Sequence, residues 1–326
     1  MVRKFLIALA AIALGAVALY LAGPRVAADT TVTFDPASIG NDVDAYLAAR
    51  EANIPDLRPE LAKEIVWADP ATKAKTPLAL VYVHGFSASK GELRPLPDKV
   101  AAALGANIFF TRLTGHGQDG AAMATASLND WVNDVAEALA IGRTIGDRVV
   151  VMATSTGGTL ATLLLADKAV SKDVAAAIFL SPNFRVQAAG ASLLAGPWGK
   201  QIAELVGGKE RSFDPPNDLV KRLWTTRYPM TATLPMAASV KAAQAVDVEA
   251  MTVPALFVIS DQDKVVDPAA TRAIAARWGA PHQLLTVDKS GDPSSHVNAG
   301  DAYSPQNTDP LAAEILQWLK GVGVGN

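Results

Sequence analysis

The 326-residue chain contains no cysteine, which excludes disulfides, thiolate metal sites and a redox-active cysteine pair but is compatible with any cellular compartment. It also lacks a strong excess of either charge, because the formal net charge is -3. No block of basic residues with interleaved aromatics is present, so the sequence offers no extended phosphate-binding surface and argues against nucleic acid as a partner. Half of the residues (50%) are hydrophobic, enough for one large buried core.

The longest hydrophobic run lies at the N-terminus. Arg3 and Lys4 precede an uninterrupted apolar run over residues 5–22, which is the layout of an export signal. Its length lies between the core of a cleaved signal, about 7 to 15 residues, and a membrane-spanning helix of about 20. We predict that residues 1–28 are a signal peptide or an uncleaved membrane anchor. Both alternatives place the domain of residues 29–326 outside the cytoplasm, in the periplasm, secreted or anchored to the membrane.

The central motif of the chain is a β-branched run at residues 149–154 that ends at a serine. The following residues have the composition of a helix, which places Ser155 at the tip of a strand-turn-helix unit. Strand and helix approach closely in such a turn, so the residues two before and two after the serine must have almost no side chain. Ala153 and Gly157 meet this requirement. The stretch resembles the G-x-S-x-G nucleophile elbow of the α/β-hydrolases, with Ala153 in place of the first glycine.

Several other apolar runs have the composition of strands buried on both faces of a parallel sheet. Together with the elbow, they resemble the α/β-hydrolase fold, a mostly parallel sheet flanked by helices, in which a cap at about 184–250 follows the strand that ends near Leu180. We also expect an edge hairpin with a lead-in helix before this sheet, and a terminal helix that begins at Asp309. The expected segments are residues 43–52 (helix), 64–68, 78–83, 107–110, 174–180, 255–259 and 283–287 (strands).

Candidates for the rest of a catalytic triad lie after the last two predicted strands. His296 follows the final strand and has the position of the triad histidine in this family. Three aspartates follow the preceding strand, and Asp267 precedes a proline and a helix, which is typical of a helix N-cap. The family pattern Asp-x-x-Val favours Asp263 over Asp261 as the acid. The resemblance therefore implies the catalytic order Ser155, Asp263, His296.

The HGF string after the strand at residues 78–83 resembles the family's oxyanion loop. It implies that the backbone N–H groups of Phe86 and Thr156 stabilise the oxyanion. We interpret His84 as a loop residue that supports this turn, and His116, in a similar GHG string, as a structural turn residue. We expect His282 to lie on the surface.

These residues predict a carboxylic-ester hydrolase that works through an acyl-enzyme and needs no metal or organic cofactor. A serine nucleophile disfavours the family branches that use aspartate. Alternatives on the same triad are peptidase, thioesterase or acyltransferase activity, and a further alternative is a non-catalytic ligand-binding homologue. The expected substrate is a small-molecule ester with a small to medium apolar acyl group, and the oligomeric state is left open. Candidate pocket walls in the cap are Leu193, Leu194, Trp198, Phe213, Leu223, Trp224, Tyr228, Met230 and Met236.

Overall fold

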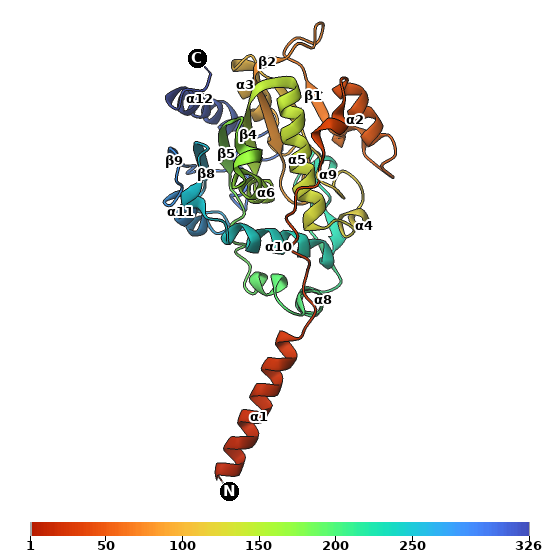
Figure 1. The fold of residues 1–326 in the computed structure, drawn as a ribbon, viewed down its shortest axis with the longest axis vertical. Coiled ribbons are helices and arrows are strands. Elements are labelled where there is room, and N and C mark those ends of the chain that lie inside the picture. The colour runs from red at the N-terminus through yellow and green to blue at the C-terminus, as the bar shows by residue number, and fades with distance from the viewer. Residues whose placement is uncertain (1, 326) are drawn as a thin grey trace.

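The computed structural model describes residues 2–325. Within this part of the chain, seven strands form one sheet in the order β1-β3-β2-β4-β5-β8-β9, in which β1 is antiparallel to β3 and all other neighbours are parallel (Figure 1). The predicted mostly parallel sheet is therefore confirmed. Its strands are β1 (Glu64–Val66), β2 (Thr76–Val83), β3 (Asn107–Phe110), β4 (Gly146–Thr154), β5 (Val174–Leu180), β8 (Ala255–Ile259) and β9 (His282–Thr286).

Different helices cover the two faces of the sheet, because side chains alternate along each strand. In β2, Ala79, Val81 and Val83 belong to one buried cluster, whereas Leu80 and Tyr82 belong to the other. Burial of these apolar side chains, worth about 25 cal/mol per Å², holds the layers together. Residues of α2 (Val43–Glu51), α5 (Leu128–Ile145), α6 (Thr156–Leu165), α10 (Thr233–Gln244) and α11 (Pro268–Ala275) join the first cluster, and residues of α3 (Leu96–Ala103), α9 (Asp218–Leu223) and α12 (Pro305–Gly321) join the second.

Two predictions, one about the edge of the sheet and one about the last helix, were wrong in detail. The strand at Glu64–Val66 is an edge strand, but it pairs with β3 rather than forming a hairpin with the next strand. Both sides of β2 are already occupied by β3 and β4, so β1 adds at the free side of β3. The terminal helix begins at Pro305 instead of Asp309, because this earlier proline already occupies the favoured first helical position, and Pro310 lies inside the helix.

A capping box lies at the start of α5. Ser127 and Asp130 exchange side-chain-to-backbone hydrogen bonds, which satisfy two N–H groups at the helix end. Trp131, on the buried face of α5, is fully buried and donates from Nε1 to the carbonyl oxygen of Thr114 at 2.9 Å. The helix therefore holds the loop that contains the GHG string.

Residues 184–250 are interposed between β5 and β8 and leave the plane of the large sheet. In Figure 1, α10 runs below the sheet, and α8 lies at the same end of the molecule as the N-terminal helix. The interpretation of the whole segment as a cap stays a prediction. It contains α8 (Gly199–Gly207), α9, α10, the antiparallel pair β6 (Glu210–Ser212) and β7 (Arg227–Pro229), and the 3-10 turns η3 (Ala191–Ala195), η4 (Met230–Ala232) and η5 (Val248–Ala250).

Helix α1 (Val2–Leu21) projects from the rest of the molecule and is fully exposed (Figure 1). In residues 2–325 it is the one helix long and apolar enough to cross a membrane, with a mean hydropathy of 2.2, and a signal sequence has the same features. It meets the domain at Trp198, whose Nε1 donates to the carbonyl oxygen of Leu19 at 3.2 Å. The other short elements are α4 (Gly120–Met123), α7 (Lys168–Ser171), η1 (Pro36–Ile39) and η2 (Pro59–Leu61).

Candidate active site

Ser155 lies in the turn between β4 and α6, as the sequence motif predicts. Its backbone has φ 50° and ψ -118°, a left-handed conformation that is unfavourable for a residue with a side chain. Two hydrogen bonds hold this conformation: the N–H of Ser155 donates to the carbonyl oxygen of Leu180 at 3.0 Å, and its own carbonyl oxygen accepts from the N–H of Asn183 at 3.0 Å. The strained turn is thus attached to the end of β5.

Small residues on both sides of Ser155 allow this turn. A methyl group at Gly157 would lie 2.3 Å from the carbonyl oxygen of Val83, so this position requires glycine. Ala153 is fully buried and pairs in register with Val83 and Phe179. Its single methyl group fits where the common motif has glycine.

His296 and Asp263 are hydrogen-bonded to each other. The Nδ1 atom of His296 lies 2.8 Å from Oδ2 of Asp263, and because a carboxylate only accepts, Nδ1 carries the proton and Nε2 has its lone pair available. The other carboxylate oxygen of Asp263 accepts from the N–H groups of Val265 and Val266 at 2.8 and 2.9 Å. These bonds fix both the acid and the orientation of the imidazole.

The loop that carries His296 is fixed by Asp292, which the sequence analysis missed. One oxygen of Asp292 accepts from the N–H groups of His296 and Val297 at 3.0 and 2.9 Å. The hydroxyl of Ser181, at the end of β5, donates to the carbonyl oxygen of His296 at 2.8 Å. The histidine loop and the turn at Ser155 are therefore attached to the same strand end. No sequence motif identifies such an aspartate, because it acts only by accepting hydrogen bonds from the N–H groups of its own loop.

Several carboxylates determine the titration of His296. Burial lowers the pKa of His296, but the hydrogen bond and charge of Asp263, followed by the charges of Glu92 and Asp292, outweigh it and raise the pKa. The raised pKa makes the neutral imidazole a stronger base, because the carboxylates stabilise its protonated form.

The two competing aspartates have other partners. Asp261 is exposed and forms an ion pair with Arg272 at 2.6 Å. Asp267 is the N-cap of α11, where it accepts from the N–H of Ala269 at 2.8 Å. Of the three, Asp263 is the one that the structure brings to His296. Among residues 2–325, no three histidine, aspartate or glutamate side chains are grouped as metal ligands.

The loop after β2 is fixed by His84. Its Nδ1 donates to the carbonyl oxygen of Gly85 at 2.8 Å, and its Nε2 accepts from the N–H of Leu113 at 3.1 Å. Because the carbonyl and the N–H of one peptide point in opposite directions, this contact orients the N–H of Phe86. Thr156 is the first residue of α6, whose initial N–H groups have no partner within the helix. Thr156 directly follows Ser155, and Gly85, the residue before Phe86, borders the nucleophile, because a methyl group at Gly85 would lie 3.2 Å from Cβ of Ser155.

His116 supports the same loop from the other side. Its Nε2 accepts from the N–H of Ser87 at 3.1 Å, and its ring lies 5.0 Å from that of His84. Burial lowers the pKa of His84 to about 4 and also lowers the pKa of His116 well below its usual value. Both rings are therefore neutral structural groups, and His282 is exposed at the start of β9.

The predicted pocket residues fall into separate groups. Tyr228 packs edge-on against Phe86, with ring centroids 5.2 Å apart. Trp224 packs against Tyr303, with centroids 5.6 Å apart, and Leu223 joins the same buried cluster. Tyr228 is therefore the candidate that contacts the oxyanion loop directly. Of the others, Leu194 and Met236 line a cavity of about 440 Å³ between η3 and α10, Met230 packs near Leu194, Phe213 is half-buried, Trp198 contacts α1 and Leu193 is exposed.

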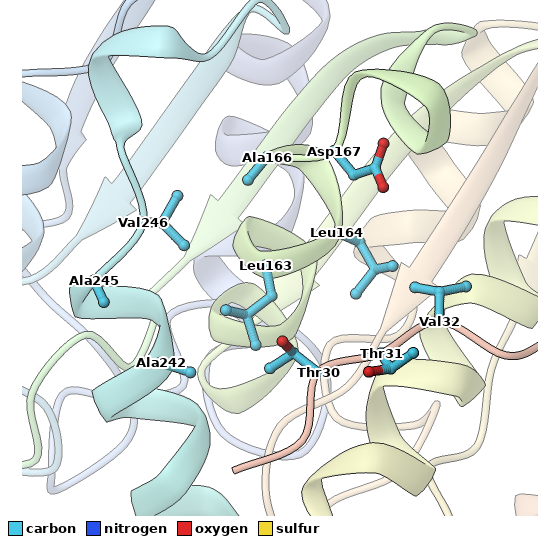
Figure 2. A pocket seen from close by; sticks show the side chains of 10 residues that line it. All are labelled: Thr30, Thr31, Val32, Leu163, Leu164, Ala166, Asp167, Ala242, Ala245 and Val246. Atoms are coloured by element: carbon cyan, nitrogen blue, oxygen red, sulfur yellow. The ribbon is translucent and has the colours of Figure 1, made fainter.

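A further cavity, of about 580 Å³, lies at the opposite end of α6 from Ser155 (Figure 2). Figure 2 shows Leu163 and Leu164 on one side of it, residues 242–246 on another, and the N-terminal segment at Thr30 and Thr31 crossing it. A ten-residue helix is about 15 Å long, so this cavity is remote from the nucleophile. None of the triad candidates lines it.

The fold and the elbow define an α/β-hydrolase. A solved structure described as that of LipS and LipT, two metagenome-derived lipolytic enzymes, has a TM-score of 0.65 and 22% identity, over 81% of this chain and 99% of the other. The monoacylglycerol lipase of Paleococcus ferrophilus has a TM-score of 0.57 and 15% identity, over 80% and 99% of the two chains. At these identities the likeness shows the fold.

The sequence also places the chain in a family. Residues 74–291 match the family described as serine aminopeptidase, S33, and the chain belongs to it. A thermostable monoacylglycerol lipase from Bacillus sp. (strain H-257) is 29% identical over 201 residues, which are 62% of this chain and 76% of that protein. The matched region includes Ser155 and Asp263, while His296 follows it by five residues.

Proposed function

We propose that this protein hydrolyses carboxylic esters, with Ser155 as nucleophile, His296 as general base and Asp263 as its supporting acid. The observation that carries the proposal is the hydrogen bond between His296 and Asp263, on a loop attached to the same strand end as the strained serine turn. Lipolytic enzymes among the structural and sequence relatives support an ester as substrate.

The reaction follows from these positions. Nε2 of His296 takes the proton of Ser155 as its oxygen attacks the acyl carbonyl, and Asp263 stabilises the resulting imidazolium. The N–H groups of Phe86 and Thr156 donate hydrogen bonds to the developing oxyanion, and each donor contributes about 3 to 4 kcal/mol. The imidazolium returns its proton to the departing alcohol. Water then cleaves the acyl-enzyme by the same route.

The acyl group of the substrate is apolar and of small to medium length. Tyr228 on the ring of Phe86 supports this assignment, because an acyl chain bound beside the oxyanion donors would meet these aromatic side chains. Each buried methylene contributes about 0.8 kcal/mol, or about fourfold in kcat/KM, until the site is full. A series of p-nitrophenyl esters from acetate to decanoate should show this rise, followed by a plateau or decline.

Truncation of one aromatic residue tests where the acyl group binds. Tyr228→Ala should move the optimum to longer acyl chains, because it enlarges the space beside Phe86. Leu194→Ala is the matched control, since Leu194 lines the separate cavity between η3 and α10 and should leave the optimum unchanged. An unchanged chain-length profile in both variants would place the acyl site elsewhere.

Peptide hydrolysis is the second candidate, favoured by the family description as serine aminopeptidase. Comparison of kcat/KM for p-nitrophenyl esters and aminoacyl p-nitroanilides separates the two. Faster cleavage of the anilides, without a chain-length preference among the esters, would replace the esterase assignment. Labelling of Ser155 by a fluorophosphonate tests the non-catalytic alternative, because labelling needs an activated serine.

The proposal also places the domain outside the cytoplasm, either released from its leader or held by α1. Support comes from the basic residues Arg3 and Lys4 before the apolar helix. Leu205 and Val206, on α8, are 86% and 80% exposed, and α8 lies at the end of the domain from which α1 projects (Figure 1). An anchored form would thus present this apolar surface toward the lipid. Cell fractionation with N-terminal mass analysis tests the location, and intact protein in the soluble cytoplasm would contradict it.

A further inference from the structure

Glu92 is a buried carboxyl group that the mechanism described above does not use. It is 3% exposed and lies in the segment between β2 and α3. Its Oε2 accepts from the N–H of Gly85 at 2.7 Å and from the hydroxyl of Tyr82 at 3.1 Å. In residues 2–325 no lysine or arginine forms an ion pair with it, and His296 is the cation that acts on its titration.

The position of Glu92 links the oxyanion loop to the nucleophile. A methyl group at Gly85 would lie 2.8 Å from Oε1 of Glu92 and 3.2 Å from Cβ of Ser155, so carboxyl and nucleophile border the same point. The hydroxyl of Tyr82 also lies 3.2 Å from Oγ1 of Thr154, the last residue of β4. The carboxyl of Glu92 therefore contacts the oxyanion loop directly at Gly85, and it reaches β4, the strand that leads to Ser155 (the serine strand), through Tyr82.

Gly85 needs this support because glycine has the widest conformational freedom of any residue. The peptide before it is held by Glu92, which accepts its N–H, and the peptide after it is held by His84, which donates to its carbonyl oxygen. Because both peptides are fixed, the N–H of Phe86 is held in a single orientation. Loss of either contact would leave this donor free to turn away from the oxyanion.

We propose that Glu92 is a positioning residue for ester hydrolysis, which holds the oxyanion loop through Gly85 and joins it to the serine strand through Tyr82. This inference rests on the proposed roles of Ser155 and Phe86. The charge of Glu92 also helps to raise the pKa of His296, so it stabilises the imidazolium that forms during turnover.

The electrostatic surroundings define the expected pH dependence. The titratable groups that interact electrostatically with Glu92 are His296, Tyr82 and Tyr303. Burial raises the pKa of Glu92 to about 7, against the opposing effects of the Gly85 hydrogen bond, the charge of His296 and the hydrogen bond from Tyr82. The charge of Glu92 in turn helps to raise the pKa of His296. Removing that charge should therefore lower the pKa of His296 and move the acid limb of kcat/KM to lower pH.

The test compares Glu92→Ala and Glu92→Gln with the full-length wild type on p-nitrophenyl butyrate, with kcat, KM and pH profiles measured for each. Glu92→Ala should lower kcat by about 10-fold to 100-fold while KM changes by less than about threefold, because a misplaced oxyanion donor acts in the transition state. Glu92→Gln should recover most of kcat at high pH, since its amide oxygen still accepts from Gly85. Its acid limb should lie at lower pH than that of the wild type. Tyr82→Phe, which keeps the Gly85 contact, should show a smaller loss of kcat.

Glu137 provides the matched control. It is also a buried glutamate, 1% exposed, and accepts from the hydroxyl of Tyr46 at 2.6 Å, but it lies on α5 and forms an ion pair with Lys63. Glu137→Gln should lower Tm without changing kcat or the acid limb. The proposal is overturned if Glu92→Ala retains kcat within about twofold, or if Glu92→Gln loses as much kcat as Glu92→Ala without a shift of the limb. A wild type no faster than Ser155→Ala would instead remove the hydrolytic assignment itself, and with it the role of Glu92.

Discussion

The loops on the two sides of Ser155 each contain buried histidines, yet these histidines have opposite electrostatic properties. His84 and His116, in the oxyanion-side loops, are fully buried, and His296, in the acid-side loop, is 8% exposed. The pKa of His296 is raised by three carboxylates, whereas burial lowers the pKa of the other two, which contact backbone groups and each other. Burial alone therefore does not identify a catalytic base. The carboxylate partner does.

The difference follows from what each loop has to do. The oxyanion-side loop must hold peptide groups in fixed directions, and a neutral imidazole does so by donating from one nitrogen and accepting at the other. In the proposed mechanism the acid-side loop must tolerate a transient positive charge. Asp263 contacts the ring of His296, and the charge of Asp292 also raises its pKa. Substitutions can distinguish a histidine that holds the oxyanion loop from one that takes part in proton transfer. They are described in order of decreasing expected effect on activity or stability.

The largest loss of kcat is expected when the proposed nucleophile or the proposed base is removed. Ser155→Ala and His296→Ala should each lower kcat by about 10⁴-fold or more, because the members of a triad act as a unit. The double variant should be no slower than either single one. Measurements of kcat together with Tm would check that the fold is intact, and additive losses in the double variant would contradict a shared mechanism.

Substitution of Asp263 and of Asp261, two residues away, tests which aspartate supports the histidine. Asp263→Asn should lower kcat by about 10⁴-fold, since an amide favours the wrong tautomer of the imidazole. Asp261→Asn removes only an exposed ion pair with Arg272, which is worth about 1 kcal/mol or less, and should leave kcat within about twofold. Steady-state kinetics on one ester decide between them, and a greater loss from Asp261→Asn would reverse the assignment.

A smaller effect is expected on the oxyanion side. His84→Gln removes the ring that fixes the Gly85 carbonyl, and should lower kcat by about 10-fold to 100-fold through the misplaced Phe86 N–H. Because His84 is neutral throughout the working range, the acid limb of kcat/KM should not move. A shift of that limb as large as the one expected for Glu92→Gln would mean that His84 acts on the proton transfer.

The smallest effect concerns stability. The pKa of His84 is about 4 in the folded protein and about 6.5 when unfolded, so the unfolded chain binds more protons between these values. The free energy of unfolding should therefore fall as pH drops from 6.5 to 4, by about 1 kcal/mol per pH unit from this residue. His84→Gln should consequently cost less stability at pH 4.5 than at pH 7.5. Urea unfolding at both values measures the difference, with His282→Gln, on the exposed end of β9, as control.

The central part of the site could be predicted because its constraints are local. The turn at Ser155 needs a small residue on each side, and the apolar runs before it have the composition of buried parallel strands, so motif and sheet follow from short stretches of sequence. The N-cap role of Asp267 was equally local, since it depends on the proline and helix that follow. Asp263 was chosen by a family pattern, and its contact with His296 spans 33 residues.

The sequence by itself determined the parallel sheet, the serine turn and the presence of an apolar N-terminal helix, because each depends on neighbours within a few residues. Only the tertiary structure decided that β1 adds to β3, that Asp292 holds the histidine loop, and that Glu92 reaches Gly85 beside Ser155. Edge pairing depends on which strand side remains free after the sheet has formed. The contacts of Asp292 and Glu92 depend on where loops meet in the folded core, where a buried carboxylate must accept whatever N–H and O–H groups surround it.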